Sequence, residues 1–476
     1  MKQFFGIGLM LVVLAHSNLG YSQSNRNHDD NGHGGFEYFI GIVGTPTPGK
    51  EEIDWSDQSL EELKDLGVNM LQLSVAFGWR PANEVLNMED LNEEQIIMWK
   101  YRIKQAEKHG FKTIAHFGIP RWLNDNPVKP ACILDQEIRD KYVHLISEFM
   151  TTFPEVNDIL VYTYDQRAWL CSEFGPCPRC TGIPLSDRLP DFLNLLTETM
   201  QKARPGNKTM LWWKPWEISK GQTIDILNKI DPKGFGLMLN SSTSNEGYPF
   251  NDGSFKSDLG VKRFVQLAYE LNIPVIGEFQ HTFYKPLYMV DDYFPRLIYE
   301  QMNGWKEMEG VIGVKEYYGF APSTFSVNYS MLKEWMKTPN ASLEELLNRI
   351  AAPYGKKSAP CMIKAWEYVA QAVEAMPWDV PAGIGGPNSK VEHNWTPVKL
   401  GNASFDTPLW KANRKSYFML TGDKIAHPWI IEDAGIRFKD ASKLEFRAVE
   451  YFDKAIAEGE RMVDNIQMQR DHIELT

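Results

Sequence analysis

One pattern of strand, loop and helix repeats eight times along the chain between residues 36 and 316. Each repeat has a short apolar run rich in β-branched and aromatic residues, followed by a stretch with helical periodicity. The expected strands are Phe36–Gly44, Asn69–Ala76, Lys112–Gly118, Asp158–Tyr164, Thr209–Trp213, Gly234–Leu239, Pro274–Glu278 and Gly310–Glu316. The expected helices are Ser59–Leu66, Asn92–His109, Gln136–Phe153, Leu185–Ala203, Ile224–Ile230, Leu259–Leu271 and Tyr293–Met308.

Two α/β architectures alternate strands and helices in this way. Eight units over about 300 residues match the size of a (β/α)8 barrel. An open doubly wound sheet normally carries a Gly-rich phosphate loop after its first strand. Here the first strand runs into Gly44-Thr-Pro-Thr-Pro-Gly49, which has no such motif. The sequence therefore favours the α/β class with a (β/α)8 TIM barrel over residues 36–325.

The pattern changes after the eighth strand. Helical periodicity without intervening strands predicts a mainly α-helical C-terminal domain over residues 340–476. Its expected helices are Ser342–Tyr354, Ala365–Ala375, Leu409–Leu420 and Ala441–Met468, with a Pro- and Gly-rich loop over Pro377–Pro397.

Residues 1–22 have the pattern of a secretory signal peptide. Lys2 precedes an apolar run from Phe4 to Leu14, and small residues stand at Gly20 and Ser22 before the expected cleavage site. Residues 23–35 are expected to form a flexible leader. The apolar run is shorter than the roughly 20 residues that cross a bilayer. We therefore expect a secreted or periplasmic protein that does not insert into a membrane.

The charge balance narrows the choice of partners. Lys and Arg number 50 against 62 Asp and Glu, a net charge of −12, whereas nucleic-acid binding needs a basic surface. The chain also has 15 Trp residues. Trp serves either as core or as a flat surface for sugar rings. We expect an oligosaccharide or polysaccharide partner and no nucleic acid, and the oligomeric state stays open.

Carboxylates follow several of the expected strands. In such barrels the C-terminal strand ends converge on one pocket. Asp165, Glu278 and Glu316 lie at strand ends, and Glu173 follows Asp165 by eight residues. Paired carboxylates are what glycosidic hydrolysis requires: one protonates the leaving oxygen, and the other attacks the sugar or activates water. The alternative for each is a salt bridge to an inward lysine such as Lys214 or Lys315.

We assign Asp165, with Glu173 as its rival, to proton donation, because Tyr164 and Trp169 would desolvate that side and raise a pKa. Glu278 becomes the nucleophile or general base, with Glu316 as rival or partner. Gly277 is expected to leave room for a sugar, and a Glu278→Gln change to leave folding nearly intact. The remaining residues expected to bind substrate are aromatic, amide and basic side chains near the strand ends: Trp79, Arg80, His116, Arg121, Trp122, Tyr164, Trp169, Trp213, Lys214, Trp216, Asn240, Gln280, His281 and Tyr317.

Three of the five cysteines lie in the segment CSEFGPCPRC after the fourth strand. In an exported protein a disulfide is the first interpretation. The second is a structural zinc ion bound by Cys171, Cys177, Cys180 and a fourth ligand. No cofactor beyond this is expected. Either arrangement would hold the loop that carries Glu173 over the pocket.

The segment TYDQ…CSEFGPCPRCTG…SDRLPDFLNLLTETMQKARPGNKTMLWW resembles glycoside hydrolase family 163. The plan of a barrel followed by helices is similar, more distantly, to families 67 and 20. The resemblance implies a glycosidase, and the similarity to family 67 implies Glu173 as the alternative to Asp165 for the acid. Family 20 enzymes have adjacent Asp and Glu on strand four, whereas Asp165 is followed here by Gln166. The similarity to family 20 therefore does not extend to this pair of acidic residues.

Two functions remain open from the sequence. The first is a glycoside hydrolase, and the second is a catalytically silent glycan-binding barrel with the same aromatic mouth. Carboxylates at the ends of strands four, seven and eight favour the enzyme. A metal-dependent deacetylase or phosphodiesterase would need clustered His and Asp, and only His116 and His281 lie at strand ends.

Overall fold

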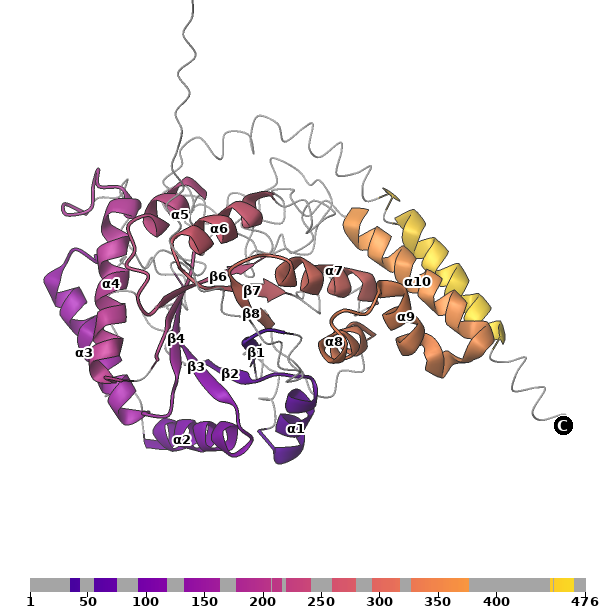
Figure 1. Ribbon diagram of the computed structural model, residues 1–476, viewed down its shortest axis with the longest axis horizontal. Coiled ribbons are helices and arrows are strands. Elements are labelled where there is room, and N and C mark those ends of the chain that lie inside the picture. The colour runs from indigo at the N-terminus through magenta and orange to yellow at the C-terminus, as the bar shows by residue number, and fades with distance from the viewer. Residues whose placement is uncertain are drawn as a thin grey trace, which may run out of the picture.

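Figure 1 shows the computed structural model as a ring of strands surrounded by helices. The strands are all parallel and close into one barrel in sequence order, with β1 hydrogen-bonded to both β2 and β8. The expected (β/α)8 fold is therefore confirmed. The structure describes residues 35–42, 55–74, 93–117, 132–162, 177–206, 208–215, 220–240, 259–279, 293–316, 327–375, 446–447 and 449–465.

Each observed strand lies within the range expected from the sequence or extends beyond that range by a single residue. Their bounds are β1 Tyr38–Ile42, β2 Met70–Ser74, β3 Lys112–Phe117, β4 Asp158–Tyr162, β5 Leu211–Lys214, β6 Phe235–Asn240, β7 Val275–Phe279 and β8 Val311–Glu316. Short buried runs flanked by Gly and Pro are a strong strand signal because both faces of a parallel sheet are covered.

The helices α1 to α7 alternate with these strands, and α8 to α10 follow them. Their bounds are α1 Asp57–Asp65, α2 Glu93–Lys108, α3 Gln136–Thr152, α4 Leu185–Ala203, α5 Lys220–Leu227, α6 Leu259–Glu270, α7 Pro295–Lys306, α8 Val327–Lys337, α9 Leu343–Ala351 and α10 Gly355–Ala375. A further helical stretch covers 446–447 and 449–465, within the expected Ala441–Met468. The expected helix Leu409–Leu420 lies outside the described residues.

Helix α8 is not among the helices expected from the sequence. This helix packs against α7, and the Asn328 side chain accepts a hydrogen bond from the backbone N–H of Phe294 at the start of α7 (2.8 Å). Met331, Leu332 and Trp335 are fully buried on its inner face. The barrel layer of helices thus extends past residue 325.

Alternate residues of each strand face the barrel interior. Tyr38 of β1 and Trp212 of β5 meet edge to face across it, with ring centroids 5.7 Å apart. Gly236 of β6 is the register partner of Trp212, and a Cβ at Gly236 would overlap the indole ring. The interior is therefore filled by side chains, as in other barrels of this size.

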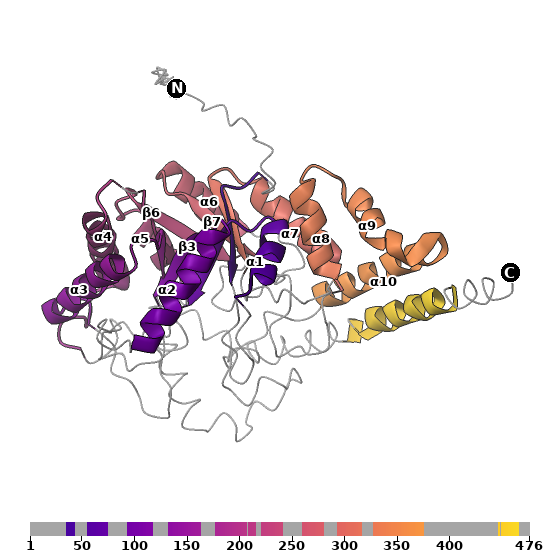
Figure 2. The same cartoon turned by 90° about the horizontal axis from the view of Figure 1, so that it is seen from below.

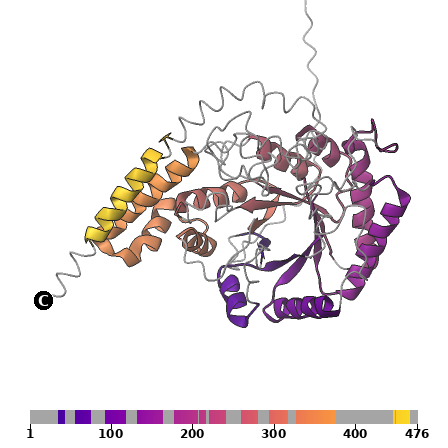
Figure 3. The same cartoon turned by 180° about the vertical axis from the view of Figure 1, so that it is seen from behind.

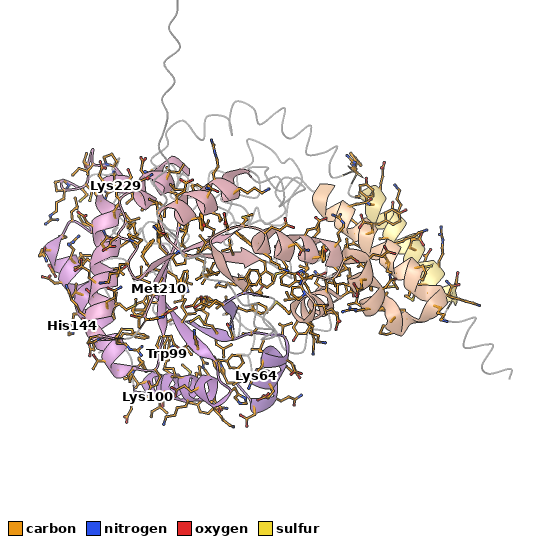
Figure 4. The ribbon with its side chains drawn as sticks, viewed as in Figure 1. Lys64, Trp99, Lys100, His144, Met210 and Lys229 are labelled. Carbon is orange, nitrogen blue, oxygen red and sulfur yellow. The ribbon has the colours of Figure 1, made fainter. Side chains whose placement is uncertain are left out.

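The outer faces of the strands pack against the helices. Trp99 of α2 contacts Phe149 and Phe153 near α3, with ring centroids 5.8 and 5.5 Å apart. Figure 4 shows Trp99 on the barrel side of α2 and the neighbouring Lys100 on its outer side. This split between a buried and an exposed face is the amphipathic pattern on which the helix predictions rested.

Helices α8, α9 and α10 extend the molecule beyond α7, and the 449–465 helix lies alongside α10 (Figures 2 and 3). Tyr451 and Phe452 pack against Ala372 of α10, and Lys454 lies over the ring of Tyr368. Of the helices that the structure describes, none combines the length and the apolarity needed to cross a membrane.

Candidate active site at the carboxyl ends of the strands

Strand register decides which residues meet inside the barrel mouth. Glu278 of β7 pairs with Lys315 of β8 and with Asn240 of β6, so these three positions share one face of the sheet. Lys214 is the last residue of β5 and pairs with Tyr162 of β4. Because the strands end here, these positions lie at the carboxyl face, where barrel enzymes carry their active sites.

Glu278 lies between two lysine side chains. Lys315 Nζ donates to Glu278 Oε1 at 2.7 Å, and Lys214 Nζ donates to Glu278 Oε2. The side chains of Glu278 and Lys315 have no exposed surface, and that of Lys214 has 2%. The three form a buried ion cluster, which we call the Lys–Glu–Lys cluster.

The charge state of Glu278 follows from its surroundings. Burial alone would raise the pKa of the Glu278 carboxyl, but the charges and hydrogen bonds of Lys214 and Lys315 outweigh it and hold the pKa below its ordinary value of 4.5. The group is therefore an anion at neutral pH. It is suited to act as a base, a nucleophile or an electrostatic partner, and not as a proton donor.

This geometry corrects one expectation about Glu278. The sequence analysis placed the group against water and substrate, so that its replacement would leave folding nearly intact. Its side chain is instead fully buried, and both carboxylate oxygens accept hydrogen bonds from ammonium groups. The salt bridge to Lys214 and Lys315, stated as the alternative to catalysis, is present.

Gly277 also has a different role from the one expected. Trp305 of α7 packs where a Cβ of Gly277 would lie, and the Trp305 indole N–H donates to the backbone oxygen of Glu278 at 3.1 Å. Gly277 therefore faces the helix layer and makes room for the indole rather than for a sugar. The close fit fixes the backbone that carries Glu278.

Two predicted site residues lie on the opposite side of the sheet. Glu316 follows the inward Lys315 and pairs with Phe279, so the register places it on the helix-facing side, where it is fully buried. Trp213 is also fully buried and contacts Phe235, with centroids 6.3 Å apart. Trp213 belongs to the core between sheet and helices, which corrects its expected place in the pocket wall, and Glu316 is not on the face that carries Glu278.

The remaining predicted residues divide into two groups. His116 of β3 pairs with Ser74 and Leu160 and is half-buried on the inward face. The backbone register of Asn240, which pairs with Glu278, places that position on the inward face as well. The others lie outside the described residues: Asp165, Glu173, Trp79, Arg80, Arg121, Trp122, Tyr164, Trp169, Trp216, Gln280, His281 and Tyr317.

Lys315 is a site residue that the sequence analysis named only as a possible salt-bridge partner. The alternation within Val311–Glu316 carried a usable signal, since Gly313 and Lys315 share one face and Val314 and Glu316 the other. Deciding which face turns inward requires the pairing with β1, where Tyr38 pairs with Gly313. That pairing is not visible in the sequence.

A second buried carboxylate lies at the opposite end of the barrel. Asp158 begins β4 and accepts hydrogen bonds from the backbone N–H of Met210 (3.0 Å) and from the indole of Trp212 (2.9 Å). Burial raises its pKa to about 6, against the effect of these hydrogen bonds. Because it lies at the amino ends of the strands, this cluster is a stabilising feature of the barrel floor rather than a candidate active site.

Three cysteines meet beside the barrel. Cys132 Sγ lies 3.3 Å from Cys180 Sγ and 3.7 Å from Cys177 Sγ. Among the described cysteines no disulfide bond is formed. Cys177 and Cys180 were expected to form one cluster, whereas Cys132 was not connected with them in the sequence. Cys171, the third residue of the expected cluster, lies outside the described residues.

Comparison with models of known protein families finds no match, and comparison with curated proteins finds none either. The resemblance to glycoside hydrolase families 163, 67 and 20 is therefore not supported beyond the residues that suggested it.

Several solved structures align with this chain at low identity. A mutant O-GlcNAc hydrolase from Thermobaculum terrenum aligns with 11% identity and a TM-score of 0.48, covering 93% of this chain and 98% of its own. A GH5-4 broad-specificity endoglucanase from an uncultured bacterium aligns with 11% identity and a TM-score of 0.41 over 60% and 85% of the two chains. The catalytic domain of a β-amylase from Paenibacillus polymyxa aligns with 11% identity and a TM-score of 0.42, covering 64% of this chain and 99% of its own. These structures are glycoside hydrolases, and the likeness extends to the barrel fold alone.

Proposed function

We propose that this protein is a secreted or periplasmic glycoside hydrolase acting on an oligosaccharide or polysaccharide. One observation carries the proposal: an ionised carboxylate, Glu278, lies on the inward face at the carboxyl end of β7, oriented through both oxygens by Lys214 and Lys315. Barrel enzymes use this end of the strands for chemistry, and glycosidic hydrolysis needs one carboxylate kept as an anion.

In this proposal Glu278 is the anionic partner of the reaction. A second group, Asp165 or its rival Glu173, protonates the glycosidic oxygen as the bond to the anomeric carbon breaks. Glu278 then either bonds to that carbon, to be displaced by water, or takes the proton from a water that attacks directly. Both routes add one water across one C–O bond.

The two lysines position Glu278. Their ammonium groups hold each carboxylate oxygen at a fixed place and keep the group ionised despite its burial. Substrate must displace or share one of these hydrogen bonds to reach a carboxylate oxygen. Lys214, at the end of β5, is then released to meet a hydroxyl or an anionic group of the sugar.

One observation favours a second candidate function, a glycan-binding barrel without catalysis. Both oxygens of Glu278 are already engaged and its side chain has no exposed surface. A carboxylate held in this way also fixes two lysine ammonium groups in place. A binding site would use these ammonium groups to hold a glycan without any reaction.

Turnover of Glu278→Gln and Asp165→Asn on cleavable glycans separates the two functions. Loss of acid–base catalysis typically lowers kcat by about 10²–10⁴-fold, and loss of a covalent step lowers it further. Glu198→Gln is a matched control, since the Glu198 side chain is 59% exposed on α4. Activity must be measured below the melting temperature of every variant.

The outcomes are distinct. Loss of turnover in Glu278→Gln, with the Glu198 control active, supports hydrolysis. Near-wild-type turnover in both Glu278→Gln and Asp165→Asn refutes the assignment of these residues. Glycan binding by a wild-type protein that cleaves none of the glycans it binds supports the binding barrel.

A further inference from the structure

We propose that Cys132, Cys177 and Cys180 bind a zinc ion that ties the start of α3 to the start of α4. The site lies outside the Lys–Glu–Lys cluster and does not depend on the proposed glycosidase activity. The sulfur geometry, the backbone that carries the sulfurs and a buried arginine beside them support the site.

The sulfur atoms are spaced for a shared metal. The Sγ atoms of Cys132, Cys177 and Cys180 all lie within 4.8 Å of one another, with two of the separations at 3.3 and 3.7 Å. Zinc–sulfur bonds of about 2.3 Å in a tetrahedral site place neighbouring sulfurs about 3.8 Å apart. A disulfide requires about 2.05 Å and joins only two of the three atoms.

The backbone presents the sulfurs from two segments 45 residues or more apart. Cys177 and Cys180 lie on one tight turn, in which the Cys177 oxygen accepts from the N–H of Cys180 at 3.2 Å and from that of Thr181 at 3.0 Å. Cys132 comes from the other segment, and its oxygen accepts from the N–H of Asp135, the N-cap residue of α3. A shared ion would therefore cross-link the segments that lead into α3 and α4.

A buried arginine supplies the independent observation. Arg188 in the first turn of α4 is 1% exposed, and its Nε donates to the Ile183 oxygen at 3.0 Å. Within the described part of the chain, its Nη1 and Nη2 atoms have no hydrogen-bond acceptor. Ile183 in turn donates its backbone N–H to the Cys180 oxygen at 3.0 Å, which places Arg188 beside the turn that carries two of the sulfurs. A buried guanidinium requires an anionic neighbour, because unpaired buried charge is costly.

A zinc–thiolate centre would provide that anion. Binding converts three thiols to thiolates and releases three protons to solvent, so a zinc ion with three thiolates carries a net charge of −1. Thiolate sulfurs in a compact tetrahedral cluster favour zinc among the common divalent ions. The fourth position is left for a further ligand.

Metal analysis of the intact protein tests the site. The full chain is purified without chelator, and its zinc content and its thiol reactivity toward Ellman's reagent are measured before and after chelation. We expect about one zinc per chain and three additional reactive thiols once the metal is removed. A protein without metal, whether its cysteines are oxidised to a disulfide or present as thiols, would overturn the proposal.

Variants locate the ion. Cys180→Ser should lose zinc, whereas Cys361→Ser is the matched control, because Cys361 lies on α10 beside Asn465. Should Cys180→Ser fail to fold, cobalt titration of the chelated wild-type chain replaces it, since tetrahedral thiolate coordination gives intense absorption bands. Cobalt binding without these bands, or zinc retained in soluble Cys180→Ser, refutes the assignment.

Discussion

Replacing Glu278 by Gln removes the carboxylate that accepts hydrogen bonds from both buried ammonium groups. The amide offers a single acceptor oxygen, and its NH2 group faces the ammonium donor of one lysine. Lys214 and Lys315 have 2% and 0% side-chain exposure, so water does not replace the lost carboxylate. We therefore expect Glu278→Gln to destabilise the fold as well as any activity.

The size of this loss follows from the burial of the cluster. Removing one partner of a buried ion pair costs about 3–5 kcal/mol, because the remaining charge is left unpaired. For a cooperative unit of this size, that loss lowers the melting temperature by about 3–7 °C. The relevant measurements are urea unfolding followed by far-UV circular dichroism and, in parallel, thermal unfolding at pH 7.

The pH dependence of the free energy of unfolding tests the charge of Glu278 in a second way. Since the folded-state pKa of Glu278 lies below 4.5, its stabilising contribution is fully present above that value and is lost as the pH falls through the folded pKa. The stability gap between wild type and Glu278→Gln should therefore be constant from pH 7 to 5 and shrink only in stronger acid.

A double variant provides the control. Glu278→Gln with Lys315→Met also removes one of the two buried ammonium groups, and should be more stable than the single Glu278→Gln variant. If Glu278→Gln loses less than about 1 kcal/mol at pH 7, below the cost of a broken buried pair, and the double variant is no better, the ionised cluster is refuted.

Three further changes have expected outcomes. The protonated form of Asp158 stabilises the folded protein, fully below its ordinary pKa of 3.8, and this contribution is lost as the pH rises through about 6. Wild type should therefore lose up to about 3 kcal/mol relative to Asp158→Asn across this range in urea unfolding. Gly277→Ala should cost about 1–3 kcal/mol through overlap with Trp305, and an unchanged melting temperature would contradict that packing. Ser342→Ala removes the N-cap of α9 and should cost about 1 kcal/mol with catalytic activity unchanged, as unfolding and turnover assays would show.

The barrel was predictable because its signals are local. Each strand is a short buried run after a Gly or Pro, and each covering helix has its own periodicity, so no long-range contact had to be inferred. Helix α8 was missed because its buried face includes Asn328, whose role is visible only once it caps the start of α7.

The candidate site was less predictable because it depends on pairing between strands. Lys315 and Glu316 are adjacent, and a register change of one residue would exchange their faces. The sequence analysis chose the carboxylate, whereas the pairing with β7 places the lysine beside Glu278. Cys132 was not linked to Cys177 and Cys180 for the same reason, since the contact joins two separate βα units.

The helix over residues 449–465 packs on α10, and this packing determines how the C-terminal part of the chain folds back. Asn465 donates to the Lys357 oxygen near the start of α10, while Tyr451 and Phe452 lie against Ala372 near its end. The two helices are therefore antiparallel, and the chain leaves α10 at Ala375 and returns at residue 446 on the same side. The contacts with Tyr451 and Phe452 cover Ala372, which has no exposed surface, so removal of the last helix would expose an apolar face of α10 to water.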